Sequence, residues 1–275
     1  MPGIGIVRSL AFTRIRTFCS QYNIVYKKLV ELDDVPDTLI AKEQNKMVRQ
    51  EVAYVGWADV YDVFYFFAQY SNNGGGALIN WINPGTFDAT LVGTPAFDSL
   101  EGFTGQNTTN NYIRTHYAPL TDKINMSQND ASIGAYVRNN TDKGWVAGAA
   151  DDGYANGLLL GPLSGGNAVI RVNSTSYAYD GMATSAGFSM GIRRIAATQK
   201  IFKNGVEVDS ENDASTGITD KEVYILLYNN NGAPSGTTDY QVSCFFIARA
   251  PSDPQALILT NAVEALMDYN GKGVI

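Results

Sequence analysis

Residues 187–209 of the chain are Gly187-Phe-Ser-Met-Gly-Ile-Arg-Arg-Ile-Ala-Ala-Thr-Gln-Lys-Ile-Phe-Lys-Asn-Gly-Val-Glu-Val-Asp209. Runs rich in β-branched and aromatic residues lie on both sides of the pair Asn204-Gly205. Asn-Gly supplies the two positive-φ positions of a type I′ turn, whose twist matches that of paired strands. The stretch therefore predicts strands at 186–194, 198–203 and 206–209, with the last two joined as a hairpin.

Short strand-type runs continue through most of the chain. The other strands that we expect lie at 60–68, 77–81, 86–92, 98–104, 110–115, 131–138, 144–149, 156–160, 167–172, 175–180, 222–228 and 240–249. Clusters of Gly, Asn, Asp, Ser or Pro separate them, and the sequence has no repeat of fixed period. This pattern favours a β-sandwich or jelly roll over a propeller or β-helix.

An amphipathic helix is expected before the strands begin. Asp37 or Thr38 can cap a helix that runs from Leu39 to about Tyr54, because the apolar residues in this range recur at helical spacing among charged ones. Gly56 then ends the helix or marks a bend.

Charge is distributed unevenly along the 275 residues, whose formal net charge is −7. Five of the 20 basic residues and none of the 27 acidic ones fall in residues 1–30. Apolar side chains alternate with these basic residues, which is more typical of a segment that docks on a protein than of a polyanion-binding arm. With an acidic body, we do not expect a nucleic-acid partner.

The lack of an expected targeting signal and the small number of cysteines predict that the chain is made and folded in a cytoplasm. Arginines interrupt every apolar run near the start, so we expect neither a secretory signal nor a membrane span. The two cysteines, Cys19 and Cys244, lie far apart in the sequence. We interpret both as thiols and Cys244 as a small core residue.

The hairpin and the segments around it carry a family resemblance. The strand with its Asn/Gly-rich loop at 222–236 and the return strand at 240–249 resemble those of concanavalin A-like and laminin G-like sandwiches. Residues 253–269 resemble the terminal helix of such domains. With 103–115 and 129–138, the pattern over about 60–270 is similar to concanavalin A-like structural proteins of tailed phages, including phages of Bacteroidetes hosts.

This resemblance implies a mainly β fold and a division of the chain. The expected fold is a concanavalin A-like β-sandwich (jelly roll) with an N-terminal arm plus helix and a C-terminal helix. Its expected parts are a basic, apolar anchoring arm at 1–35, a helical segment at 36–58, and the sandwich with its terminal helix at 59–275. Fold alone does not set function, because this sandwich hosts lectins, hydrolases and structural modules.

Catalytic residues are not expected. Glucanases of this fold use a Glu-x-Asp-x-x-Glu strand, whereas Asp98 and Glu101 lack a third carboxylate. Glu207 and Asp209 alternate on one strand, so they would face the same side, as on any exposed hairpin. The only histidine, His116, precedes a loop proline and is read as an ordinary loop residue. We therefore predict no enzyme, zinc site or phosphate-binding loop.

One loop offers candidate metal ligands. Asp151, Asp152 and Asn156 place three oxygen-bearing side chains within six residues, and calcium is the cation such oxygens suit. The segment 209–213 is a second, weaker candidate. Asp-Gly and Asn-Asp are also ordinary turn residues, so a purely structural loop stays open. No other cofactor is expected.

Glycan recognition needs an aromatic platform beside polar groups, because sugar faces stack on rings while hydroxyls need fixed partners. The best candidates are Tyr154, in the acidic loop, and Tyr228 with its neighbours Asn229 and Asn230. Tyr179 beside Asp180 is a third. Each tyrosine could equally pack at the rim of a sandwich with its hydroxyl in water.

The function that follows from the resemblance is that of a non-enzymatic virion protein: a head fibre, tail fibre or capsid-decorating protein. Residues 1–58 would dock on other virion proteins, and the sandwich would be displayed, as a homo-oligomer by analogy with such proteins. The first alternative is a glycan-binding adhesin that recognises host surface polysaccharide. The second is a glycan hydrolase on the same fold.

Overall fold

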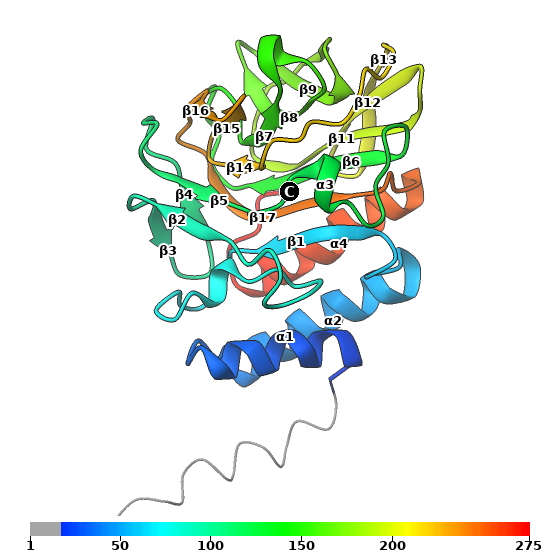
Figure 1. Ribbon diagram of the computed structural model, residues 1–275. Coiled ribbons are helices and arrows are strands. Elements are labelled where there is room, and N and C mark those ends of the chain that lie inside the picture. Colours follow the sequence, from blue (N-terminus) through cyan, green and yellow to red (C-terminus); the bar gives the residue numbers. More distant parts are fainter. Residues whose placement is uncertain (1–17) are drawn as a thin grey trace, which may run out of the picture.

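The computed structural model describes residues 18–275. The first 17 residues of the predicted anchoring arm lie outside this range. The described chain is layered, with helices on one side, one β-sheet in the middle and a second β-sheet on the far side (Figure 1). The predicted mainly β sandwich with helices near both ends is confirmed.

The middle layer, which we call sheet A, has eight strands. All of its pairings are antiparallel, and β1 (Tyr61–Phe66) pairs with residues 244–248 of β17, beyond the part that pairs with β4. The other strands follow the order β13 (Val206–Asn212), β12 (Thr198–Lys203), β11 (Gly187–Ile195), β6 (Ala131–Val137), β17 (Gln241–Ala248), β4 (Gly102–Thr104) and β3 (Ala96–Asp98).

The outer layer, sheet B, has nine strands. Its order is β10 (Ala178–Gly181), β9 (Asn167–Ser174), β8 (Gly157–Ser164), β7 (Ala147–Ala150), β14 (Tyr224–Ile225), β5 (Tyr112–Arg114) and β2 (Thr90–Val92), with β15 (Tyr228–Asn230) and β16 (Ala233–Ser235) off this path. The pairing of β15 with β7 is parallel, and the others are antiparallel. Short helical turns, η2 (Gly76–Leu78), α3 (Pro119–Asp122) and η3 (Asp152–Tyr154), lie between strands.

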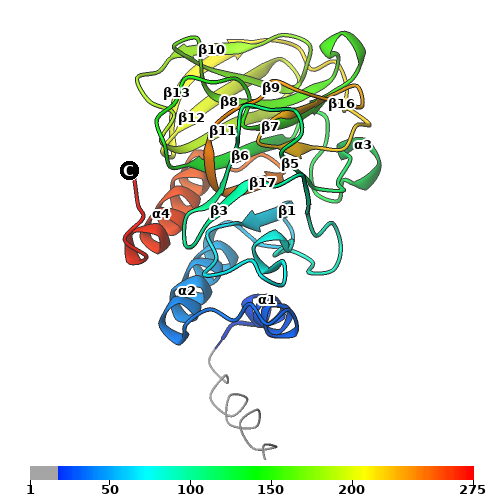
Figure 2. The same cartoon turned by 90° about the vertical axis from the view of Figure 1, so that its left-hand side faces the viewer.

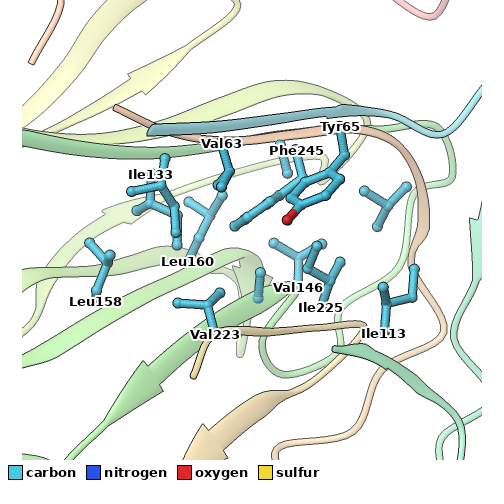
Figure 3. Close-up of a cluster of buried hydrophobic side chains, with 14 of the residues drawn as sticks. Val63, Tyr65, Ile113, Ile133, Val146, Leu158, Leu160, Val223, Ile225 and Phe245 are labelled. Carbon is cyan, nitrogen blue, oxygen red and sulfur yellow. The ribbon is translucent and has the colours of Figure 1, made fainter. Parts of the chain in front are cut away.

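The main core fills the space between the sheets. Figure 3 shows Val63, Tyr65 and Phe245 of sheet A facing Leu158 and Ile225 of sheet B, all fully buried. Successive strand residues point to opposite faces, so every second side chain reaches this core. The layer is dominated by β-branched, leucine and aromatic residues, which are the types that strongly favour burial.

A second core lies on the other face of sheet A. Three helices, α1 (Ser20–Glu31), α2 (Thr38–Tyr54) and α4 (Asp253–Tyr269), cover this face (Figure 2). The central strands of sheet A are therefore buried on both faces, which explains why all six residues of β1 are buried, whereas the edge strands β13 and β3 are largely exposed. Cys244 is fully buried here as a free thiol, as predicted.

Several expected elements are confirmed by their local chemistry. Helix α2 begins after Asp37, whose carboxylate accepts a hydrogen bond from the amide of Leu39 at 2.8 Å. Helix α4 spans the predicted range and begins with a capping box between Ser252 and Gln255. Asn204 and Gly205 have φ values of 51° and 78°, as a type I′ turn requires.

Other sequence predictions were wrong. Residues 77–81 do not form a strand, because Asn80 bonds to the amide of Phe64 and to Asp88 in place of a strand ladder. The predicted strand at 222–228 is split into β14 and β15 at Leu226, whose φ is 72°. Within the predicted arm, α1 is a helix that buries Tyr22, Val25 and Leu29 against the rest of the chain.

Candidate ligand-binding face

The outward face of sheet B is built from small residues at its centre. In β8, Leu158 and Leu160 join the core, so Gly157, Leu159 and Gly161 lie on the opposite face. The same alternation in β9 sends Ile170 and Val172 inward and Arg171 outward. This sequence pattern leaves room above the sheet for large side chains from the surrounding loops.

Five aromatic rings and one guanidinium occupy this space, and we call them the aromatic face: Trp145, Tyr154, Arg171, Tyr177, Tyr179 and Tyr228. The ring centroids of Trp145 and Tyr177 are 5.7 Å apart and nearly parallel, at 22°. Tyr228 lies 5.8 Å from Trp145 and 6.3 Å from Tyr154, and Tyr179 lies 5.4 Å from Tyr177. These separations are typical of interacting aromatic pairs, so the rings form one continuous cluster.

Exposure divides the aromatic face into a surface and a support. The side chains of Tyr179 and Tyr154 are 54% and 39% exposed, and Trp145 and Tyr177 are half-buried. Tyr228 is only 3% exposed and supports the rings above it; burial raises the pKa of its hydroxyl. Gly236 (φ 65°) leaves space for this packing, because a Cβ there would lie 2.6 Å from the Tyr228 ring. The four more exposed rings are the ones that a ligand can touch.

Arg171 is the central charge of the aromatic face. Its guanidinium carbon lies 3.6 Å from the ring centroid of Tyr177 and 5.2 Å from that of Tyr154. Its Nη1 donates to the carbonyl oxygen of Tyr154 at 2.7 Å, which ties the loop to the sheet. Burial lowers the pKa of Arg171, yet guanidinium groups stay protonated at neutral pH. The rings therefore surround a permanent cation.

The structure brings together the three tyrosines predicted as glycan-binding candidates, Tyr154, Tyr179 and Tyr228. Asn229 is buried in β15, where its Nδ2 donates to the Glu222 carbonyl and its Oδ1 accepts from the Gly232 amide. Asn230 lies at the end of β15, where it pairs with Ala233 and Ala150. Whether these residues bind a glycan stays a prediction.

Sequence reasoning missed Trp145, Tyr177 and Arg171. The alternation Tyr177-Ala178-Tyr179 carried a usable signal, because the small residue faces the core and both tyrosines face outward. Arg171, flanked by Ile170 and Val172, carried another, since a lone charge in an alternating strand must lie on the exposed face. The sequence does not show that Trp145, Tyr154, Tyr177 and Tyr228 lie close together in the fold.

The predicted calcium ligands are engaged with protein partners. The carboxylate of Asp151 accepts from Thr219 Oγ1 at 2.6 Å and from Asn156 Nδ2 at 2.8 Å, and Asp152 accepts from the Gly153 amide. Within residues 18–275, no three His, Cys, Asp or Glu side chains gather as a cation site. The calcium site stays a prediction, and the observed bonds hold the loop that carries Tyr154.

Acidic residues weighed as catalytic candidates also have structural partners. Glu101 is paired with Arg138 and Lys272, and Glu207 with Lys200 at 2.6 Å. Glu207 and Asp209 do not share a face as expected. A register shift in β13 places Glu207 opposite Phe202, on the helical side, and Asp209 opposite Ile201, on the core side.

His116 and the surface hollows give no competing site. The Nε2 atom of His116 lies 2.8 Å from Thr90 Oγ1, and its amide donates to Glu222. A shallow hollow of about 410 Å³ lies against α2, in the layer opposite the aromatic face, among solvated lysines and Arg49. In the part of the chain that the structure describes, no helix is both long and apolar enough to cross a bilayer.

Comparisons with known proteins identify the fold. No protein-family model and no curated protein matches the sequence. Among solved structures, the receptor-binding domain of botulinum neurotoxin type G is similar at a TM-score of 0.55 and 12% identity, over 74% of this chain and 51% of that domain. The same domain of the C/D mosaic serotype is similar at 0.53, with the same identity and coverage.

A third similar structure is domain 4 of an extracellular arabinanase from Geobacillus stearothermophilus, solved with arabinotriose. Its TM-score is 0.49 at 16% identity, over 73% of this chain and 98% of that domain. This chain spans about half the length of the neurotoxin domains. At such low identity, the likeness establishes a shared β-sandwich fold.

Proposed function

We propose that this chain is a non-catalytic binding module that holds a glycan on the aromatic face of sheet B. The observation that carries the proposal is the grouping of four partly exposed rings over one sheet surface, contributed by the loop before β7, by η3, by the loop before β10 and by β10 itself. Sugar rings present C–H faces that stack on such side chains, and burial of aromatic surface supplies the free energy.

The polar side of the proposed site comes from the same residues. Tyr154 and Tyr179 carry hydroxyl groups at an exposed surface, Asp152 lies in η3 with Tyr154, and Asn230 lies at the end of β15. Sugar hydroxyls need fixed donors and acceptors around a stacking ring. The neurotoxin domains of similar fold are described as receptor-binding, which agrees with a binding role for a sandwich of this kind.

For the setting of this module we propose display on a virion, as a head fibre, tail fibre or capsid-decorating protein. The supporting observation is geometric: the helical layer and the aromatic face lie on opposite sides of sheet A (Figure 1). A chain docked through its N-terminal region would then present sheet B outward. Antibody labelling of intact particles in electron micrographs should detect the sandwich; label only on opened particles would contradict display.

Glycan binding is tested with an array of bacterial surface polysaccharides, followed by calorimetric titration of the best ligand. Replacing Tyr154 or Tyr179 by alanine should weaken binding about fivefold, since one stacked ring contributes on the order of 1 kcal/mol. Tyr70→Ala is the matched control, because Tyr70 is similarly exposed, at 58%, and lies outside the aromatic face. Equal binding by all three variants would contradict the proposed site.

A further inference from the structure

We propose that the ligand of the aromatic face is an acidic glycan, and that Arg171 recognises its anionic group. This inference rests on the proposed function and narrows its ligand class. It starts from a cation that the protein has not neutralised. Arg171 is 4% exposed, and among the described residues no carboxylate lies within ion-pair distance of it.

A second buried arginine shows what this chain does with a structural guanidinium. Arg193 donates to the carbonyl oxygens of Val172, Ala196 and Asp213, and its Nη2 lies 3.3 Å from the carboxylate of Asp213. Arg171 has one carbonyl acceptor, and its Nε has no partner. A buried guanidinium normally has its donors satisfied and its charge paired. Among the described residues, Arg171 therefore lacks the carboxylate partner that Arg193 has, and an external oxyanion can take that place.

The surroundings of Arg171 favour an external acceptor. Its two nearest neighbours above the sheet are the rings of Tyr154 and Tyr177, and both are partly exposed. Cation–π contact offsets part of the cost of burying the charge but accepts no directed hydrogen bond. A sugar stacked on these rings would bring a carboxylate or sulfate to the guanidinium, which suits planar or tetrahedral oxyanions.

Because the protein as a whole is negatively charged, an acidic glycan needs a local positive charge such as Arg171 in order to bind. The formal net charge of −7 opposes the approach of a polyanion. General attraction therefore cannot select an acidic glycan, and selection must come from a charge inside the site. The Arg171 side chain lies over Gly157, where the absence of a Cβ leaves room for it. A Cβ added at Gly157 would lie 2.9 Å from Arg171 Cδ.

The test compares acidic oligosaccharides with their neutral counterparts in calorimetric titrations of the full chain. Uronate, sialate and sulfated ligands are each paired with the carboxyl-reduced or desulfated form. At least one acidic member should bind about tenfold or more tightly than its neutral form, as expected of a charge-assisted hydrogen bond. In Arg171→Met this preference should vanish, while Arg171→Lys should keep part of it.

Controls separate the possible failures. Arg194→Met removes a partly exposed arginine that pairs with Asp253, the first residue of α4, and it should leave the preference unchanged. The unfolding temperature of each variant shows whether a lost preference for the acidic ligand is caused by misfolding. The comparison of acidic and neutral ligands can also be made with the unmodified protein alone. Equal binding of acidic and neutral forms by the unmodified protein would overturn this inference and leave the glycan proposal intact. Binding of no glycan in either form would overturn both.

Discussion

The buried carboxyl of Glu51 predicts a strong pH dependence of stability. Glu51 lies on α2 with no exposed surface; its Oε2 accepts from the Tyr61 hydroxyl at 2.7 Å, and its Oε1 has no partner. Burial raises the pKa of Glu51 from 4.5 to about 8. Between these values the folded protein keeps a proton that the unfolded chain has released, so stability should fall as the pH rises through this window.

The size of the effect follows from the shift in pKa. Each unit corresponds to about 1.4 kcal/mol, so ionisation of the unfolded chain should cost the folded state roughly 3 kcal/mol by pH 7. Glu51→Gln cannot ionise, and its amide oxygen can still accept from Tyr61. Its free energy of unfolding should change far less between pH 5 and 8, and the variant should be the more stable protein at pH 8.

Urea denaturation at pH 5, 6, 7 and 8 measures this difference. The matched control is Glu43→Gln, on the same helix, where the carboxylate forms a surface ion pair with Lys46. Its pH profile should follow that of the unmodified protein, because exposed pairs contribute little. If Glu51→Gln and the unmodified protein keep parallel profiles from pH 5 to 8, the assignment of a buried, protonated Glu51 is refuted.

Two further predictions concern sheet A. Gly134→Ala should destabilise the fold by about 1–3 kcal/mol in urea denaturation, because the added Cβ would overlap the buried ring of Phe246, and an unchanged midpoint would show that the sheet can adjust. The Nζ atom of Lys203 donates to the carbonyl oxygen of Ser185 and to the hydroxyl of Ser189, and among the described residues it has no carboxylate partner. Burial lowers the pKa of Lys203 to about 8. Stability should therefore rise with pH between about 8 and 10.5, and this rise should be smaller in Lys203→Met; equal slopes would contradict it.

The parts of the fold that the sequence predicted are those set by local chemistry. The Asn204-Gly205 turn and the caps of α2 and α4 depend on residues within a few positions of each other. Strands with alternating residues were found for the same reason. Helix α1 was missed, because its helical character depends on packing Tyr22 and Leu29 against α2, Trp81 and the turn at Gly76.

The site was only partly predictable, for a related reason. Tyr154 and Tyr228 were chosen for their polar neighbours, but the structure places Tyr228 beneath the surface as a support. Trp145 and Tyr177 gain their role from pairing of β7, β8, β9 and β10, which the sequence does not contain. The unpaired state of Arg171 likewise depends on which carboxylates the fold keeps away from it.

The central claim, that a glycan covers the aromatic face, is tested most directly by acrylamide quenching of tryptophan fluorescence. The chain has three tryptophans; Trp57 and Trp81 are 3% and 1% exposed, so quenching should report mainly Trp145. A saturating glycan identified on the array should markedly reduce quenching, and Trp145→Phe should abolish this response. A glycan that binds tightly but leaves the quenching of Trp145 unchanged would show that it binds elsewhere and would contradict the account.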